Sequence, residues 1–190
     1  MPVLKKTVAL IGLAVLMSFL TADPTHSKIE VKYDEFDETT TYMSTFESIG
    51  PWRLIRFNVF LDNDDALAGF SIELYKLERE WHFFSNEDMR IKIDKEIIAI
   101  PVLKTDSEYI SHNALMTYAA YLPGKNAVDR IVDGEEITMR VYMSNRPDIT
   151  WDVPERVLAE WKELLYKADV YDNGKSSDQF CFIGTTSAGR

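Results

Sequence analysis

Four consecutive residues carry the side chains best suited to hold a metal ion. Asp62, Asn63, Asp64 and Asp65 offer several hard oxygen ligands within one turn. Calcium takes six to eight such oxygens, and backbone carbonyls and water can complete its shell. Asp62, Asp64 and Asp65 are therefore candidate calcium ligands. The alternative, which we favour, is a solvated and negatively charged hairpin tip.

Other residues that carry chemistry are scattered along the chain. The three histidines, His26, His82 and His112, lie far apart in the sequence, and Cys181 is the single cysteine. Zinc sites need clustered His and Cys ligands. The adjacency of Ser111 and His112 does not indicate a catalytic triad, because triad members meet in space from distant positions. The eight glycines are dispersed and form no phosphate-binding loop. We expect no enzymatic activity and no cofactor.

One enzymatic alternative stays open. The chain contains 31 acidic residues, and two carboxylates at a suitable separation can hydrolyse a glycosidic bond. The sequence does not give that separation. A small secreted hydrolase that depends on carboxylates is therefore the alternative function.

The tryptophans are the other candidate functional residues. Trp52, Trp81 and Trp151 occupy expected strand starts or bends, where an aromatic ring can stack on a sugar or anchor a protein partner. We treat these three as binding candidates. The alternative is that they close the ends of a β-sandwich. Trp161 falls within an expected helical stripe, so we expect it in the core.

The elements that must position these residues are mostly strands, because apolar and polar residues alternate with a period of two. Such alternation puts one face of a strand on a core and the other in water, as in antiparallel sheets. Five segments show it strongly: 29–33, 55–61, 70–75, 89–93 and 137–143. Three weaker segments are 39–46, 97–103 and 116–122. The longest expected loop is the polar segment 104–113. The sequence predicts a mainly β (α+β) fold, either an antiparallel β-sandwich or a curved sheet.

Two helices are expected. A short one covers 125–132, with Gly134 just beyond its end. The second runs from Val153 to about Ala168 and carries one apolar stripe. Asp152 is its expected N-cap, and Pro154 falls in its first turn. We expect the stripe to cover the sheet; docking of this helix on a partner protein is the alternative.

The first 27 residues have the pattern of a secretory signal peptide. Lys5 and Lys6 precede an apolar run from Val8 to Leu20, which is shorter than the roughly 20 residues that a membrane-spanning helix needs. We expect cleavage between Ala22 and Ser27; an uncleaved anchor is the alternative. Residues 28–169 would then form a single domain, periplasmic or secreted, with a disordered tail at 170–190.

The charge of the chain limits its partners. With 21 basic and 31 acidic residues, the net charge is −10. An acidic protein repels the phosphates of nucleic acids and anionic lipid headgroups. Nucleic-acid binding and electrostatic docking on a membrane are therefore disfavoured, and we expect no transmembrane helix in the mature protein.

Four segments together resemble a known class of protein. They are Trp81–Phe84, Met89–Asp94, Met116–Leu122 and Arg130–Tyr142. Their order is similar to that of small exported bacterial β-rich domains of unknown function, in which three strands and a short helix lead into a final strand. The resemblance implies a sandwich-like or curved-sheet fold. It implies no chemistry, since that class has no assigned activity.

These observations favour an exported, non-catalytic binding or structural module of the cell envelope. Its partner would be a protein or an envelope component, contacted through a sheet edge or the C-terminal helix. A calcium-dependent adhesin-like role is a further hypothesis, and the oligomeric state is open.

Overall fold

The computed structural model describes residues 26–80, 82–111 and 114–170, which form ten strands and two helices. One antiparallel sheet contains, in spatial order, β1 (His26–Asp34), β2 (Thr39–Ile49), β3 (Trp52–Leu61), β4 (Leu67–Glu78), β8 (Ala114–Tyr121) and β7 (Val102–Ser111). A second antiparallel sheet contains β10 (Ile149–Asp152), β9 (Ile137–Val141), β5 (Met89–Ile93) and β6 (Glu96–Ile100). The helices are α2 (Lys125–Asp133) and α3 (Glu155–Lys167).

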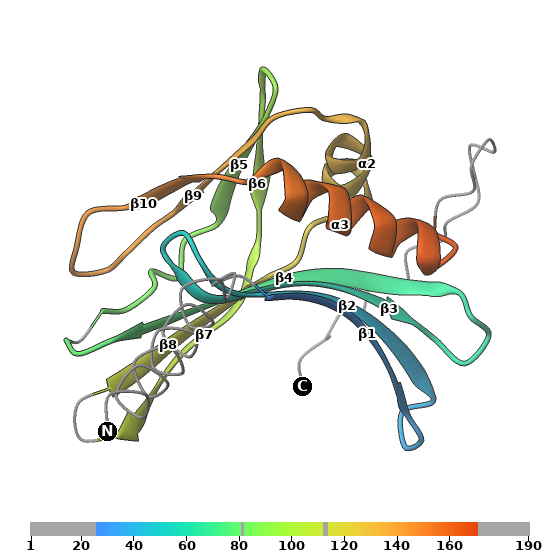
Figure 1. Ribbon diagram of the computed structural model, residues 1–190, viewed down its shortest axis with the longest axis horizontal. Helices are drawn as coiled ribbons and strands as arrows, with labels where there is room; N and C mark the ends of the chain where they lie inside the picture. Colours follow the sequence, from blue (N-terminus) through green and yellow to red (C-terminus); the bar gives the residue numbers. More distant parts are fainter. Residues whose placement is uncertain (1–25, 81, 112–113, 171–190) are drawn as a thin grey trace, which may run out of the picture.

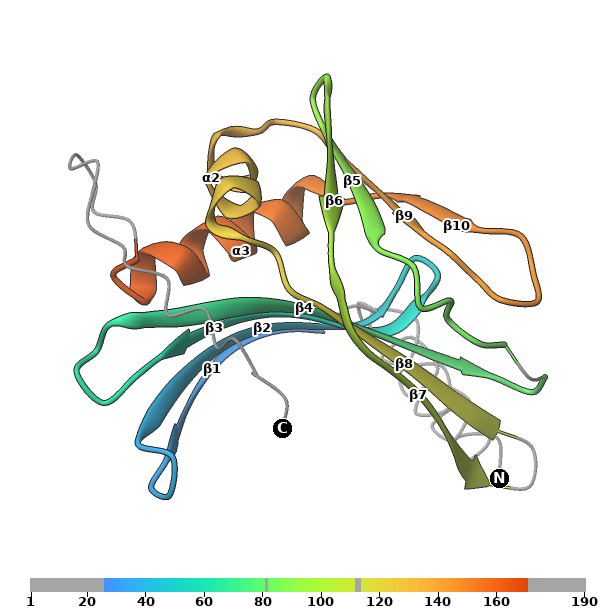
Figure 2. The same cartoon turned by 180° about the vertical axis from the view of Figure 1, so that it is seen from behind.

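The six-stranded sheet is strongly curved. Figures 1 and 2 show it as an arch, with α3, α2 and the four-stranded sheet on its convex side. α3 packs over β2 and β3, and α2 packs against α3. The predicted mainly β fold, with antiparallel strands, a short helix and a C-terminal amphipathic helix, is confirmed.

The core lies between the arch and the elements on its convex side. The apolar stripe of α3 is buried there; its members are Val157, Leu158, Trp161, Leu164 and Leu165. The ring of Phe57 on β3 lies 5.3 Å from that of Trp161, and it also stacks on Phe70 of β4 at 6.2 Å. The expectation that α3 covers the sheet is therefore confirmed.

One predicted inward-facing set is exposed. Val31 and Tyr33 of β1 are 57% and 63% exposed, although they alternate with charged residues as core residues would. The β1–β2 hairpin bends away from α3 (Figure 1), so no described element covers its apolar side there. The strand was predicted correctly, and Ile29 packs against the core as expected, but the predicted burial of Val31 and Tyr33 is wrong.

The segment 104–113 was also predicted wrongly, as a loop. Residues 102–111 form β7, which pairs with β8 along its length. The weak strand expected at 97–103 divides at Pro101 into β6 and the start of β7. β10 was not predicted at all, since its four residues are too few to show a period.

The start of α3 differs from the expectation as well. Pro154, and not Asp152, is the N-cap residue, and the helix begins at Glu155. The Asp152 carboxylate instead accepts a hydrogen bond of 2.7 Å from Thr138 Oγ1, because β10 places the two residues opposite each other. Within the described ranges, no helix has the length and apolar character to cross a membrane.

Some predicted features lie outside the described residues. They are the signal segment 1–27 except for its last two residues, the tail 170–190 except for Val170, and the residues Trp81, His112 and Cys181.

Candidate functional site

The candidate calcium ligands lie in the β3–β4 turn, as the sequence indicated. Asp62 is committed to the turn itself: its Oδ1 accepts hydrogen bonds from the backbone N–H groups of Asp64 at 3.0 Å and Ala66 at 2.9 Å. Asp65 adopts a left-handed φ of 57°. In the part of the chain that the structure describes, no three His, Cys, Asp or Glu side chains are placed to share a metal ion. Asp62, Asp64 and Asp65 thus shape a hairpin tip without converging on one point.

Two of the three candidate tryptophans come together. The rings of Trp52 and Trp151 meet edge-on at 6.0 Å, and Trp52 stacks on Phe84 at 6.4 Å. Trp52 is 2% exposed, so its ring belongs to the core, whereas Trp151 is half-buried. This aromatic cluster joins the six-stranded sheet to β10.

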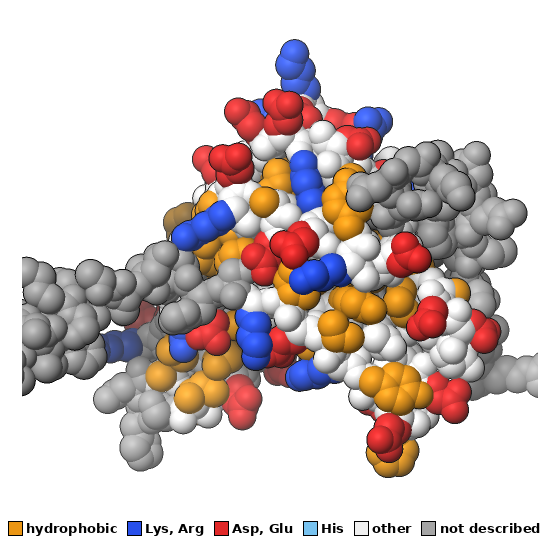
Figure 3. Space-filling view, turned by 45° about the vertical axis from the view of Figure 1, so that its right-hand side comes forward, with side chains coloured by type: hydrophobic (Ala, Val, Ile, Leu, Met, Phe, Trp, Pro, Cys, Tyr) orange, Lys and Arg blue, Asp and Glu red, His pale blue; other side chains and the backbone are white. Residues whose placement is uncertain are grey.

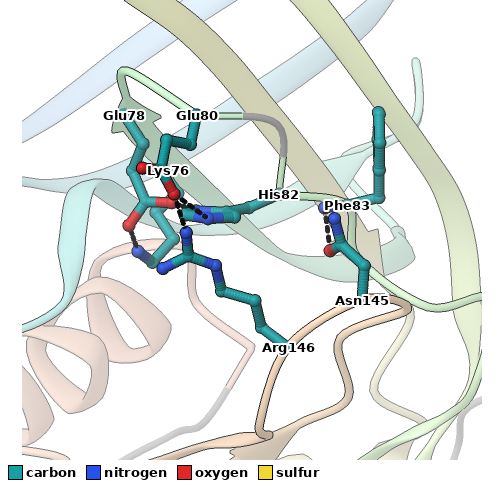
Figure 4. A network of polar contacts seen from close by, with 7 residues as sticks. All are labelled: Lys76, Glu78, Glu80, His82, Phe83, Asn145 and Arg146. Atoms are coloured by element: carbon teal, nitrogen blue, oxygen red, sulfur yellow. Dashed lines mark hydrogen bonds and ion pairs between the residues drawn. The ribbon is translucent and has the colours of Figure 1, made fainter.

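Beside this cluster lies a network of charged side chains (Figure 4) that the sequence did not single out. His82 is 4% exposed; its Nδ1 contacts the Glu78 carboxylate, and its Nε2 lies 3.9 Å from a Glu80 carboxylate oxygen. Glu78 also pairs with Lys76, and Glu80 with Arg146. Burial lowers the pKa of Lys76, and the charge of Arg146 lowers this pKa further.

The network connects the two sheets. Lys76 and Glu78 lie at the C-terminal end of β4, whereas Arg146 lies in the loop between β9 and β10. Next to it, the backbone N–H of Phe83 donates to Asn145 Oδ1 at 3.4 Å. A depression of about 300 Å³ borders Lys76 and Glu78 and reaches the β2–β3 turn. The two carboxylates of the network converge on one imidazole, and each of them also has a cationic partner.

The concave face of the arch carries a second polar group of residues. The rings of Tyr75 and Tyr118 lie 4.8 Å apart, and the Arg56 guanidinium lies 5.8 Å from the Tyr75 ring centre. Tyr75 donates a hydrogen bond of 3.3 Å to Glu73. Burial, reinforced by the Glu73 carboxylate, raises the pKa of Tyr118 to about 12 and also raises that of Tyr75. Both hydroxyls are therefore neutral hydrogen-bonding groups at ordinary pH.

The outer face of the four-stranded sheet is basic, although the chain as a whole is acidic. Arg90 and Lys92 of β5 and Arg140 of β9 are all exposed, while their strand neighbours Met89, Ile91, Ile93, Met139 and Val141 are buried. The register puts Arg90 directly opposite Arg140. Together with Ile97, Thr138, Tyr142 and Thr150, the three cations line a depression of about 340 Å³. We call it the basic depression.

The cations of the basic depression lack acidic partners within the described ranges. Among the residues that the structure describes, no carboxylate forms an ion pair with Arg90, Lys92 or Arg140, and the Arg140 side chain donates a hydrogen bond to Thr150 Oγ1 at 3.4 Å. Like charges directly opposite each other in a sheet are destabilising, on the order of 0.5 kcal/mol. The exposed Asp152 carboxylate lies on the same face, opposite Thr138, but forms no ion pair with these cations among the described residues. The fold therefore places three positive charges on one surface without a direct carboxylate partner in the described ranges.

Sequence reasoning missed the basic depression because its residues come from four strands. The sequence does show cations at polar positions of the segments 89–93 and 137–143. Only the pairing of β5 with β9 shows that these cations lie next to one another.

Comparisons with protein-family models, with curated proteins and with solved structures gave no match for this chain.

Proposed function

We propose that the protein is an exported, non-catalytic binding module of the cell envelope, and that the basic depression holds an anionic envelope component. The observation that carries this proposal is the set of three exposed cations, Arg90, Lys92 and Arg140, which have no carboxylate partner in the described chain. A bound anion would offset the repulsion between Arg90 and Arg140.

The chemistry of the lining residues favours an organic anion. Guanidinium groups bind carboxylates and phosphates through paired hydrogen bonds. Tyr142 and Ile97 add an aromatic and an apolar surface beside these cations. A volume of about 340 Å³ is at the lower end of the range for small-molecule sites. The ligand class is thus a small molecule, or a terminal group, with at least two negative charges.

The charge of the whole protein affects how this ligand must bind. A net charge of −10 repels anions at long range, so attraction depends on short contacts inside the depression. Added salt screens such contacts at an exposed site. Export to the periplasm or the cell exterior is supported by the signal-peptide pattern of the first 27 residues, in particular Lys5, Lys6 and the apolar run at 8–20.

Titration calorimetry with citrate, an organic anion with three carboxylates, tests the proposal. We expect saturable binding that weakens with salt, and a dissociation constant that rises roughly tenfold or more in Arg90→Gln and in Arg140→Gln. Arg156→Gln is the matched control, because Arg156 is an exposed arginine on α3, away from the depression. Absence of saturable binding, or an equal loss in the Arg156 control, would refute the proposal.

A second candidate function is a small secreted hydrolase that uses carboxylates. It is favoured by the convergence of Glu78 and Glu80 on His82, together with the depression of about 300 Å³ that Glu78 borders. A panel of chromogenic glycosides and esters tests it. Turnover that Glu78→Gln abolishes and Glu108→Gln on β7 preserves would support a hydrolase; an inactive wild-type chain would exclude these reactions.

A further inference from the structure

β1 is an open edge of the six-stranded sheet. It pairs with β2 over nine consecutive residues without a shift in register, and no other described strand lies beside it. The opposite edge strand, β7, has register irregularities near both of its ends. Irregularities of this kind twist an edge away from further pairing, whereas a regular edge offers its free backbone groups to another strand.

The side chains of β1 divide between two faces. Ile29, Val31 and Tyr33 point to the side that carries α3, since they lie opposite the β2 residues Ser44, Tyr42 and Thr40. Lys28, Glu30, Lys32 and Asp34 alternate with them along the strand and point to the other side. Val31 and Tyr33 are 57% and 63% exposed. Figure 3 shows hydrophobic side chains exposed among acidic ones at the bottom of the molecule, where the β1–β2 hairpin lies.

We propose that β1 pairs, antiparallel, with β1 of a second copy of this chain, around a two-fold axis at Val31. In this register Lys28 lies opposite Asp34, Glu30 opposite Lys32, and Ile29 opposite Tyr33. Every charged residue from 28 to 34 then faces an opposite charge, and every apolar residue faces an apolar one. Pairs of both kinds stabilise antiparallel sheets.

Shifted registers are disfavoured by the same sequence. An axis at Glu30 puts Glu30 opposite itself and Lys28 opposite Lys32. An axis at Lys32 puts Lys32 opposite itself and Glu30 opposite Asp34. Like charges then face each other directly, which is unfavourable. An axis at Ile29 restores the Lys28–Glu30 match but moves Tyr33 and Asp34 past the start of the partner's β1.

The geometry of the fold permits this contact. A two-fold axis perpendicular to the sheet keeps each face of β1 on the same side in both copies, so the interface is isologous and closed. α3 packs over β2 and β3. The six-stranded sheets of the two copies would join into one continuous sheet, with Val31 and Tyr33 beside apolar side chains of the partner's β1. The basic depression lies on the other sheet, so the proposed dimer does not depend on the proposed function, and each can be tested without the other.

Charge reversal tests the register. Sedimentation equilibrium of the purified full chain should give a dimer for the wild type. Position 30 of one copy faces position 32 of the other, so Glu30→Lys sets two lysines against each other and Lys32→Glu sets two glutamates against each other. Each change should raise the dimer dissociation constant roughly tenfold or more. The double variant E30K/K32E restores opposite charges and should dimerise like the wild type. An equimolar mixture of the two single variants should form a heterodimer, since their charges are complementary.

Other outcomes would overturn the proposal. A wild-type chain that stays monomeric up to millimolar concentration excludes the dimer. A dimer that both single variants leave intact does not use β1, and a double variant that stays monomeric contradicts the register. Lys104→Glu on the other edge strand, β7, is the control and should leave dimerisation unchanged. Circular dichroism of every variant shows that it has folded.

Discussion

At the scale of single residues, some positions require a particular residue type because of neighbours in space and not because of the local sequence. Gly50 is an example. It adopts a φ of +57° in the β2–β3 turn, and a Cβ there would lie 2.3 Å from Nε1 of Trp151. Trp151 comes from β10, far later in the chain, so the need for glycine at position 50 follows from the contact between the two sheets.

Replacement of this glycine should therefore be costly. We expect Gly50→Ala to lower the free energy of unfolding by about 1–3 kcal/mol, because it adds both backbone strain and a steric conflict. Urea denaturation measures the change. Gly69→Ala is the control, since a Cβ at Gly69 meets nothing within 4 Å; it should change stability by less than about 1 kcal/mol. Equal effects at the two positions would contradict the role given to Trp151.

The tyrosine pair on the concave face should make stability depend on alkaline pH. Burial raises the pKa of Tyr118 to about 12, from 10.0 in an unfolded chain. The folded state therefore holds this proton more tightly, and the stabilisation is complete below about pH 10 and is lost as the pH rises towards 12. Thermal midpoints across this window should fall less steeply in Tyr118→Phe than in the wild type. Tyr166→Phe on α3 serves as the control, and identical slopes in wild type and Tyr118→Phe would contradict the assignment.

At the scale of elements, α3 is the best example of agreement between local pattern and tertiary role. The five members of its predicted apolar stripe are its five buried residues. Leu164 is fully buried, and we expect Leu164→Ala to cost about 2–5 kcal/mol through lost packing and the cavity that remains. Lys167→Gln, which removes the exposed ion pair of 3.1 Å with Glu163, should cost less than about 1 kcal/mol. Chemical denaturation compares the two; similar losses would mean that the stripe does not anchor the helix.

The sequence predicts elements when their burial is periodic, and it fails when burial is decided elsewhere. Met89, Ile91 and Ile93 of β5 show the period because one face of the strand meets the core and the other meets water. β7 lacks this contrast: Lys104, Asp106 and Glu108 are exposed on one face, the other face carries the polar residues Thr105 and Ser107, and the apolar residues Leu103 and Tyr109 are exposed. In β1 the alternating pattern predicts burial that only Ile29 shows in part, because Val31 and Tyr33 are exposed.

The candidate sites were less predictable than the fold for a related reason. Asp62 and Trp52 stood out by residue type, but one shapes a turn and the other is core. Arg90 and Arg140 are ordinary strand residues in the sequence, and only the pairing of β5 with β9 sets them opposite each other. A function that depends on the relation between strands cannot be seen in either strand alone.

At the scale of the whole molecule, the two sheets and α3 share one core, while the hairpin ends of the arch extend beyond it (Figures 1 and 2). The buried cluster includes residues of both sheets and both helices, among them Phe57, Ile91, Ile131 and Trp161. Unfolding should therefore be cooperative through this core. The β1–β2 and β7–β8 hairpins have fewer buried neighbours, so local opening should begin there.

Hydrogen exchange can test both the difference in local stability between core and hairpins and the proposed dimer. Amides of β3, β4 and α3 should exchange most slowly, because opening them requires loss of the shared core, and amides of β1 and β7 should exchange fastest in dilute protein. If β1 pairs with a second copy, its outward amides become protected as the protein concentration rises, while those of β7 do not change. Glu30→Lys should remove the concentration dependence at β1 and leave the core amides unaffected. Protection of the β1 amides that does not change with protein concentration would contradict pairing between copies. If protection of the β7 amides increased with concentration instead, the contact would lie at the other edge of the sheet.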